Sequence, residues 1–475
     1  MDFSTLTLEI GAAVLALVLL VVGLFLPDGK KGQVGIVAAL GFAFLLAMSF
    51  LAPGGKGPFF MGQYMNDGIS VLFKQIFILG SLLVTLMSLR FTRRFEDARG
   101  EFYVLLAFSL VGMMGMAGAT DFLTLYIALE LMSIPLVVLT AFEKGSMRST
   151  EAGMKYVLLG AMSSAILLFG LSFLYGAAGS FGYGAVMAAL TSGQTGPLVV
   201  IGGIFALAGL AFKVAAVPFH MWSPDIYEGA PVPVTAFLAV ASKAAGFAAL
   251  LRFFPVVLVP LGLGMTTLIV LIAALSMILG NLTAIPQTNI KRMLAWSSIA
   301  HAGYMLLGVM VASFAGAAAL VYYLLVYLFA NVGAFAAVTA WSELSGSDEI
   351  SSFKGMWKKS PLISTVFIVS LLSLAGIPPA AGFIGKFFLF AEVAHKGYLW
   401  LVALALVMSV VSLYYYVSVI KTLVSEAPEG ETSKADIPLA LRAVMLLSAV
   451  ATVLLGVLPG PVMGYIRNIL SAMSS

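Results

Sequence analysis

Residues 211–233 read AFKVAAVPFHMWSPDIYEGAPVP and interrupt an apolar run that begins near Leu198. Lys213 lies at the end of that run, and Pro218 follows within the next turns. Proline lacks a backbone N–H and its ring clashes with the carbonyl one turn earlier, so Pro218 predicts a break in the helix. Within a bilayer each freed backbone group is costly unless protein or water satisfies it. The stretch therefore predicts a buried polar cavity that Lys213 lines.

The composition places this break inside a membrane. Of 475 residues 61% are hydrophobic and 10% are charged, and the mean hydropathy is +1.08, which is typical of an all-α polytopic membrane protein. About fourteen apolar segments approach the ~20 residues that cross a bilayer. They are Leu6–Leu26, Val34–Leu51, Ile69–Ser88, Phe102–Ala119, Phe122–Phe142, Ala152–Gly176, Leu198–Val217, Val232–Phe254, Met265–Ile285, Met293–Val311, Ala317–Ala340, Leu362–Glu392, Tyr398–Ile420 and Ile437–Leu458.

Residue usage excludes several classes of cofactor within this chain. The sequence has no cysteine, which excludes iron–sulfur clusters bound by thiolates and disulfides. The three histidines, His220, His301 and His395, fall on separate segments, which disfavours a haem with two histidine ligands, and we expect no metal site. No G-x-G-x-x-G motif follows a strand, so no nucleotide site is predicted. The net charge of +4 comes from membrane-flanking loops and does not indicate nucleic-acid binding.

Positive charge is distributed unequally between the two membrane flanks. If the segments alternate from an outside N-terminus, 17 of the 25 Lys and Arg residues fall on the cytoplasmic side and four on the other. The cytoplasmic group is Lys30, Lys31, Arg90, Arg93, Arg94, Arg99, Lys144, Arg148, Lys155, Lys291, Arg292, Lys354, Lys358, Lys359, Lys421, Lys434 and Arg442. The outer group is Lys56, Arg252, Lys396 and Arg467. This bias predicts a multi-pass protein of the bacterial inner membrane with both termini outside.

Four lysines remain, and all of them lie within the apolar segments: Lys74, Lys213, Lys243 and Lys386. A charge at the centre of a membrane helix costs about 2.5–3.5 kcal/mol, so such lysines need a partner, water or a function. Glu130 is the one carboxylate that we place equally deep. Lys74 is only five residues into its segment, and we expect it to snorkel to the interface.

The twelfth segment repeats the architecture of the seventh. SLLSLAGIPPAAGFIGKFFLF breaks at Pro378 and Pro379 and then presents Lys386, which is 173 residues after Lys213. Glu130 and His301 are 171 residues apart, so an offset near 172 maps segments four to eight onto nine to thirteen. Because each unit has five helices, the two copies must be inverted, and their broken helices point to an ion pathway at the bilayer midplane. The predicted units are residues 1–100, 101–256, 257–424 and 425–475.

The buried charges predict a proton relay. A neighbouring carboxylate favours the charged form of a buried lysine, so a change at Glu130 would release a proton from Lys213. Lys243 lies among small residues in mid-segment, and we interpret it as a relay group together with Lys386. His301 fits either a relay or a packing role. We expect the region of His220, Trp222 and Asp225 to shape the break and its cytoplasmic end.

Three runs together resemble one family: PFHMWSPDIYEGAPVPVTAFLAVASKAAGF (218–247), NIKRMLAWSSIAHAGYMLLG (289–308) and LAGIPPAAGFIGKFFLF (374–390). Over nearly its whole length the chain resembles the antiporter-like membrane subunits of respiratory complex I. It is most similar to the N-type: the M-type generally has Glu where Lys386 stands, and the L-type has a long lateral helix after its last span.

The resemblance implies a role for each matching position. Glu130 matches the carboxylate on the fifth helix, and Lys213 matches its partner on the broken seventh. Lys243 matches the central lysine on the eighth helix, and Lys386 matches the terminal lysine on the broken twelfth. A proton would pass from Lys213 to Lys243, and Lys386 would exchange with one side of the membrane.

The resemblance also implies the reaction and the partners. Electrons would pass from NADH through FMN and iron–sulfur clusters to a quinone, all held by other subunits of a proton-translocating enzyme. This chain would contact lipid, the other membrane subunits and the peripheral redox arm. Related subunits of Na⁺/H⁺ antiporters, membrane-bound hydrogenases and F420H2 dehydrogenases are the alternatives, and four central charges argue against a purely structural scaffold.

Overall fold

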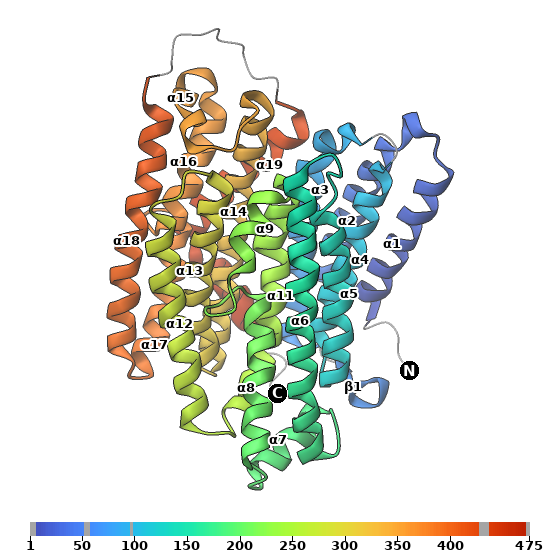
Figure 1. The fold of residues 1–475 in the computed structure, drawn as a ribbon, viewed down its shortest axis with the longest axis vertical. Coiled ribbons are helices and arrows are strands. Elements are labelled where there is room, and N and C mark those ends of the chain that lie inside the picture. The colour runs from blue at the N-terminus through green and yellow to red at the C-terminus, as the bar shows by residue number, and fades with distance from the viewer. Residues whose placement is uncertain (1–5, 52–57, 96–97, 427–436, 472–475) are drawn as a thin grey trace.

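The structure, a computed structural model, describes residues 6–51, 58–95, 98–426 and 437–471. This part of the chain is a bundle of roughly parallel and antiparallel helices (Figure 1). The cations Lys56 and Lys434, which the sequence assigns to opposite membrane flanks, lie outside the described residues.

Twelve helical spans in the described part are long and apolar enough to cross a membrane. They are α1 (Thr7–Phe25), α2 (Gly32–Leu51), α3 (Gly68–Phe91) with η4 (Thr92–Arg94), α4 (Arg99–Gly118), α5 (Phe122–Thr140), α6 (Met147–Ala178), the composite span Val232–Leu258, α12 (Leu263–Ala284), α13 (Ile290–Met310), α14 (Phe314–Ser345), α18 (Leu399–Val424) and α19 (Leu439–Val457). The composite span consists of α10 (Val232–Phe237), the π-helical segment η5 (Leu238–Ser242), α11 (Lys243–Phe253) and the π-helical segment η6 (Phe254–Leu258).

The two predicted breaks account for the remaining two segments. The shorter apolar helices α8 (Pro197–Lys213) and α16 (Pro361–Ala375) each end in mid-bundle and are followed by α9 (Trp222–Gly229) and α17 (Ala381–His395). Smaller elements connect the spans: η2 (Asp28–Lys30), β1 (Pro58–Phe59), η3 (Phe60–Gly62), β2 (Tyr64–Met65), α7 (Tyr183–Thr191), η7 (Ile350–Phe353), α15 (Met356–Lys359) and α20 (Pro459–Ser471). The fourteen-segment prediction, with breaks in the seventh and twelfth, is confirmed.

The helix caps show where the two repeats correspond. The side chains of Asp121 and Asn289, 168 residues apart, cap α5 and α13 by accepting from the two backbone N–H groups two and three residues on. Ser146 and Ser313, 167 residues apart, cap α6 and α14, each by accepting from the one backbone N–H three residues on. Both of these helices have 32 residues and end at a glycine with left-handed backbone. Segments α4–α6 therefore correspond to α12–α14.

The same caps show that the repeats are inverted. A backbone bridge joins Asp121 to Gly182 beside α7, and the equivalent bridge joins Asn289 to Glu349 beside η7 and α15. Figure 1 places α7 and α15 at opposite ends of the bundle. The corresponding corners thus lie on opposite sides of the predicted membrane.

The predicted offset of 172 is a few residues too long. The cap-to-cap offset of 168 sets Glu130 level with Ser298, so its predicted match with His301 is wrong. At the breaks, Lys213 is the last residue of α8, before the interruption, whereas Lys386 lies in α17, after it, so these two lysines do not correspond. The offset changes along the chain because the connections differ in length, so lysine spacing alone could not align the copies.

Lys74 does not snorkel, which corrects the prediction for this residue. Its side chain is fully buried, and Nζ forms an ion pair with Glu9 on α1 and donates to Asn66 Oδ1 at 2.8 Å. Tyr64 OH also donates to Glu9. Burial raises the pKa of the Tyr64 phenol well above its usual value, and the Glu9 carboxylate raises it further, so the phenol remains a donor. Glu9 lies in the first turn of α1, and our sequence analysis did not single it out.

Arg252, on α11 of the first repeat, contacts the start of α3 close to the Lys74–Glu9 pair. Its guanidinium is 8% exposed and makes a two-pronged contact with Asp67, at 2.6 and 3.0 Å. Its Nε donates to Ala117 O at 2.9 Å. One buried ion pair therefore joins α1 to α3, and the other joins the start of α3 to α11, while the hydrogen bond to Ala117 adds α4.

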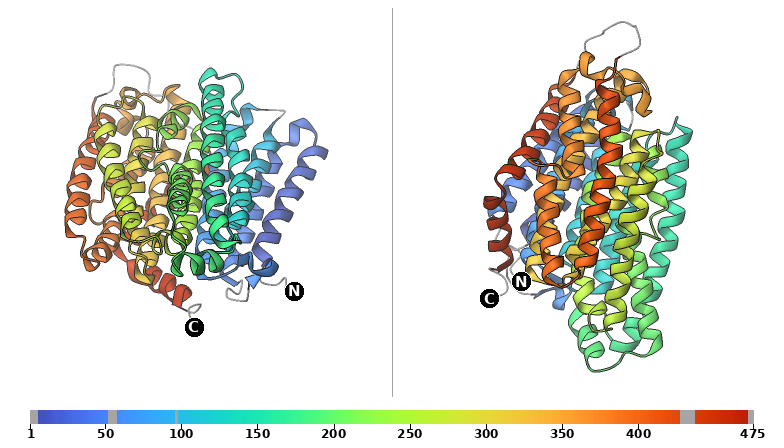
Figure 2. Two further views of the ribbon diagram at one scale, coloured as in Figure 1. Left: turned by 60° about the horizontal axis from the view of Figure 1, so that its bottom comes forward. Right: turned by 90° about the vertical axis from the view of Figure 1, so that its left-hand side faces the viewer.

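The segment after α19 is also a helix. The helix α20 buries Met463, Ile466 and Leu470, and Tyr465 OH accepts a hydrogen bond from Gln75 on α3 at 2.7 Å. Figure 2 shows it obliquely across the end of the bundle opposite α15. An amphipathic helix packed in this way covers the ends of α3 and α14.

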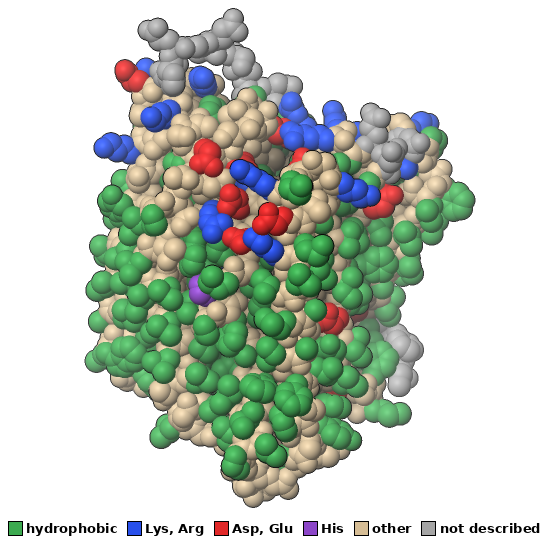
Figure 3. Space-filling view, viewed as in Figure 1, with side chains coloured by type: hydrophobic (Ala, Val, Ile, Leu, Met, Phe, Trp, Pro, Cys, Tyr) green, Lys and Arg blue, Asp and Glu red, His purple; other side chains and the backbone are tan. Residues whose placement is uncertain are grey.

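Charged residues gather at one end of the bundle. Figure 3 shows most of the visible Lys, Arg, Asp and Glu side chains near the end that carries α15, above a broad hydrophobic belt. This distribution agrees with the predicted bias in flanking charge.

We expect Lys74→Met to destabilise the protein by about 3–5 kcal/mol, because it leaves the Glu9 carboxylate buried without its cation. Thermal unfolding and retention of the subunit in purified membranes measure the loss. Glu9→Gln/Lys74→Met should recover much of it, and Lys30→Met, at an exposed site, should leave stability unchanged. Equal stability of Lys74→Met and Lys30→Met would contradict a role for the pair.

Candidate functional site

The first break is held open by side chains that satisfy its backbone. α8 ends at Lys213, and the chain is not helical again until Trp222. Trp222 Nε1 donates to Phe212 O at 2.8 Å, and Val217 N donates to Ser276 Oγ at 2.9 Å. These contacts from α9 and α12 fix the end of α8, as the membrane environment requires.

Lys213 faces α5 at this break. Its side chain is 4% exposed, and Nζ donates to Ser133 Oγ at 2.9 Å. Glu130 lies one turn earlier on α5, is half-buried, and accepts from Ser164 Oγ on α6. The predicted pair is therefore on facing helices and interacts electrostatically, but within the described residues it forms no ion pair at or below 4.0 Å. The hydroxyl of Ser133, three residues after Glu130, is the side-chain group that Lys213 contacts.

Lys243 lies in the composite span, directly after the π-helical segment η5. It is 1% exposed, and Nζ donates to the carbonyl oxygen of Ser298 at 2.9 Å and to Ser298 Oγ. Tyr327 OH on α14 donates to the same Ser298 hydroxyl at 2.9 Å. Since Ser298 belongs to α13, Lys243 of the first repeat is bound by the second.

His301 lies one turn further along α13 and is surrounded by tyrosines. Its Nδ1 is 2.7 Å from Tyr323 OH, and its Nε2 is 3.3 Å from Tyr416 OH. Its ring centroid is 5.1 Å from that of Tyr327. Tyr416 also hydrogen-bonds Ser297. His301 is therefore hydrogen-bonded at both ring nitrogens and lies beside the tyrosine that contacts the Lys243 cluster.

Lys386 bridges the second break. From the second turn of α17 its Nζ donates to the carbonyl oxygens of Leu374 and Ala375, both at 3.1 Å, and to Ser409 Oγ at 2.8 Å. These carbonyls are the last ones of α16, where the helix dipole is negative, so a cation is stabilised there. Nζ also lies 4.9 Å from the ring centroid of Tyr304.

Lys213, Lys243 and Lys386 each donate to a serine hydroxyl, those of Ser133, Ser298 and Ser409. Hydroxyl groups can both donate and accept. Tyr327 contacts Ser298, and Tyr323 and Tyr416 contact His301. Our sequence analysis missed these hydroxyl residues. In the sequence these residues are marked only by being polar within apolar segments. That position does not show which neighbouring helix each side chain faces.

The space beside the first break is polar as well. Four buried atoms there have no hydrogen-bond partner among the described residues: His220 Nδ1, Ser223 Oγ, Tyr227 OH and Trp296 Nε1. The His220 ring packs against that of Trp296 at 5.4 Å. Such atoms are usually satisfied by bound water, so this region between Lys213 and Lys243 is suited to hold it.

Asp225 lies in the first turn of α9 and forms ion pairs with basic residues of two neighbouring helices. It accepts from Lys155 on α6 at 2.8 Å and from Arg292 on α13 at 2.7 Å, and Arg292 also pairs with Glu228 at 2.9 Å. The expected role of Asp225 in shaping this end of the break fits these contacts.

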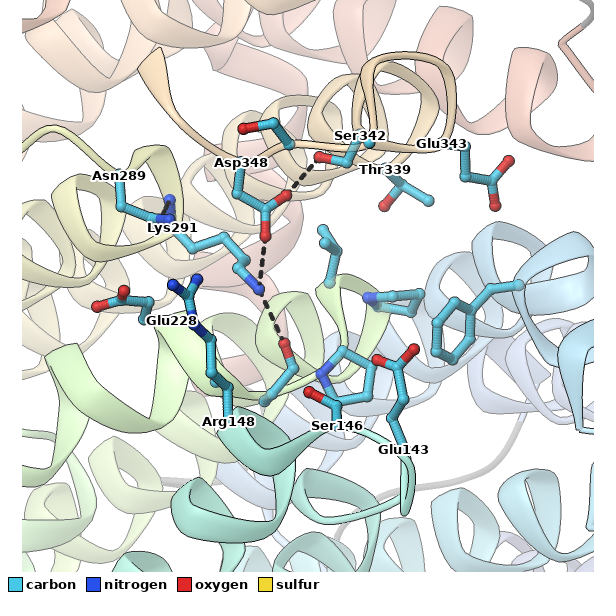
Figure 4. Close-up of a pocket in the computed structure, with 18 of the residues that line it drawn as sticks. Glu143, Ser146, Arg148, Glu228, Asn289, Lys291, Thr339, Ser342, Glu343 and Asp348 are labelled. Carbon is cyan, nitrogen blue, oxygen red and sulfur yellow. Dashed lines mark hydrogen bonds and ion pairs between the residues drawn. The ribbon is translucent and has the colours of Figure 1, made fainter. Parts of the chain in front are cut away.

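A polar hollow of about 510 Å³ opens between the repeats at the basic end (Figure 4). We define it by Glu143, Ser146, Arg148, Glu228, Asn289, Lys291, Thr339, Ser342, Glu343 and Asp348. Lys291 pairs with Asp348 at 2.9 Å and donates to Ala230 O at 3.2 Å. The start of α10, at Val232 and Pro233, also lines it. The hollow therefore borders the helical span that carries Lys243.

The described part of the chain holds no group of three or more His, Asp or Glu side chains placed to bind a metal ion. The residues of the site are instead lysines, hydroxyls and one histidine, which can donate, accept or transfer protons.

The sequence profile of the family described as "NADH:quinone oxidoreductase/Mrp antiporter, TM" matches residues 119–412. NADH-quinone oxidoreductase subunit N of Moorella thermoacetica is 46% identical, over 98% of this chain and 98% of that protein. A chain of respiratory complex I from Thermus thermophilus has a TM-score of 0.81 at 37% identity and covers 96% of this chain and 98% of its own. A chain of the Mrp complex from Dietzia has a TM-score of 0.86 at 20% identity. It covers 100% of this chain and 98% of its own length, which indicates a shared fold.

We expect Gly382→Ala to disrupt the second break, because the added Cβ would clash with the backbone oxygen of Ser373. Overpacking of this kind costs about 1–3 kcal/mol or more, so the yield of folded protein and its melting temperature should both fall. Gly264→Ala, on an open face of α12, is the matched control and should behave as wild type. Unchanged stability of Gly382→Ala would show that α16 and α17 are not packed as described.

Proposed function

The chain belongs to the NADH:quinone oxidoreductase/Mrp antiporter transmembrane family, and on that basis we propose that it is the N-type, proton-translocating membrane subunit of an NADH–quinone oxidoreductase. The observation that carries this proposal is the series of buried lysines and hydroxyls within a chain alike over its full length to such subunits. Electron transfer from NADH through FMN and iron–sulfur clusters to quinone takes place in partner subunits. This subunit couples that transfer to proton movement.

In the proposed relay, Glu130 and Lys213 receive the coupling signal. A displacement of α5 or of the α8–α9 break changes the distance between the two charges, because Ser133 and not Glu130 is the present partner of Lys213. Loss of the carboxylate's influence favours release of a proton from Lys213. The polar region around His220 and Tyr227 then carries the proton toward Lys243.

From Lys243 the proton passes to the second repeat. Ser298 and Tyr327 are its first hydroxyl contacts, and His301 with its tyrosine partners leads toward Lys386. Lys243 and Lys386 have neutral hydrogen-bond acceptors within the described residues, so no adjacent carboxylate fixes their charge there. Lys386 exchanges the proton at the second break.

We propose that the protein is a subunit of a complex in the bacterial inner membrane, with the charged end in the cytoplasm and both termini outside. The polar hollow would supply protons to Lys243 from that side, because it collects several carboxylates at the start of α10. The beginning of α1 and the helix α20 lie toward the opposite end (Figure 2).

We expect Lys213→Ala to reduce NADH-driven proton pumping by on the order of tenfold or more, with assembly preserved. Quinone reduction and proton uptake in sealed membrane vesicles measure the two activities. Lys358→Ala, at an exposed site on α15, is the control. Wild-type pumping by an assembled Lys213→Ala complex would overturn the relay, and Na⁺-dependent transport without quinone reduction would favour the cation antiporter.

We expect His301→Phe to reduce pumping by roughly tenfold or more while assembly is retained, because phenylalanine keeps the ring packing but cannot transfer a proton. The same vesicle assay, compared with thermal unfolding, separates the two roles of the ring. If pumping is unchanged, His301 has only a packing role.

A further inference from the structure

A second hollow, of about 720 Å³, lies at the charged end between the end of α3 and the start of α19. We call it the arginine hollow, and Arg90, Arg93, Arg94, Glu343 and Leu439 are among the residues that line it. The three arginines come from little more than one helical turn, so their spacing of three and four residues brings them onto one face.

The arginine hollow carries more positive than negative charge. Arg90 pairs with Glu343 at 3.3 Å. Arg93 and Arg94 are exposed, and neither forms an ion pair with a described residue, although Arg94 lies 5.9 Å from the ring centroid of Phe91. Two guanidinium groups are thus available to bind an anion from this hollow.

The other wall of the hollow is apolar and continues along the bilayer. Leu439 is 81% exposed at the first position of α19. Leu446, Val450, Val453 and Val457 are also exposed and follow at spacings of three, four and seven residues, so they form one stripe along the helix. A cationic hollow is therefore joined to an apolar track about the length of an acyl chain.

We propose that the arginine hollow binds the phosphate head group of an anionic phospholipid, with the acyl chains along the exposed stripe of α19. A guanidinium binds two phosphate oxygens at once, which a single ammonium does not. Each basic residue near an anionic lipid surface strengthens the attraction to that surface. The site contains none of the relay lysines, so the proposal does not depend on the proton relay, although Arg94 and Glu343 also line the polar hollow.

The apolar stripe decides between two sources of the same phosphate chemistry. A free phosphate ion would use the arginines alone, whereas a phospholipid also covers Leu439 and the residues below it. Because Arg90 is paired with Glu343, the guanidinium groups offered to a phosphate diester are those of Arg93 and Arg94.

The test uses the whole purified complex of wild type and of Arg93→Gln/Arg94→Gln. Each is exchanged into equal mixtures of phosphatidylglycerol and phosphatidylcholine, and the retained lipids are counted by mass spectrometry. We expect the double variant to retain phosphatidylglycerol at roughly tenfold lower affinity and phosphatidylcholine unchanged. Arg93→Lys/Arg94→Lys should fall between the two, because it keeps charge but not the two-pronged contact.

Lys358→Gln removes one positive charge at the same end and away from the hollow, and it should retain lipid as wild type does. Equal phosphatidylglycerol retention by wild type and the double variant would overturn the proposal. Displacement of the lipid by an excess of inorganic phosphate would assign the arginines to a free anion. Loss of a partner subunit from the double variant, with lipid retained, would assign the hollow to a protein contact and would also overturn it.

Discussion

Every backbone polar group inside a bilayer must find a partner, and the two interrupted helices show how this chain meets that requirement. At the first break the freed groups are satisfied by Trp222 and Ser276, which come from neighbouring helices. At the second, the last carbonyls of α16 are satisfied by Lys386 itself. Lys386 is therefore part of the site and also stabilises the end of the broken helix.

This dual use explains why the breaks and the buried charges occur together. A lysine in hydrocarbon needs oxygen acceptors, and the C-terminal end of an interrupted helix offers several with a favourable dipole. Lys213 uses a side-chain hydroxyl instead, and this leaves its charge more dependent on Glu130, which is close but not bound. The two breaks share a shape and differ in electrostatics.

The sequence predicted the apolar segments, both breaks and the buried lysines, because hydropathy, proline and isolated charge are local signals. It did not predict the pairing of Lys74 with Glu9, since a carboxylate three residues into a helix looks like a flanking residue until α1 and α3 are placed side by side. Nor did it predict the hydroxyl contacts, which depend on how α13 and α14 are rotated toward each other. The repeat offset failed for a related reason, because matching charges does not match helix caps.

The corrected alignment gives the series a physical asymmetry. Glu130 on α5 corresponds to Ser298 on α13, since the capping residues Asp121 and Asn289 are 168 positions apart. In the first repeat this position is a carboxylate near Lys213, and in the second it is a neutral hydroxyl bound to Lys243. Equivalent positions in the two copies therefore present different charges to two lysines of the first repeat. A proton moving from the first toward the second leaves the influence of a fixed carboxylate for a region of neutral hydroxyls, so a change at Glu130 alters the balance at one end only.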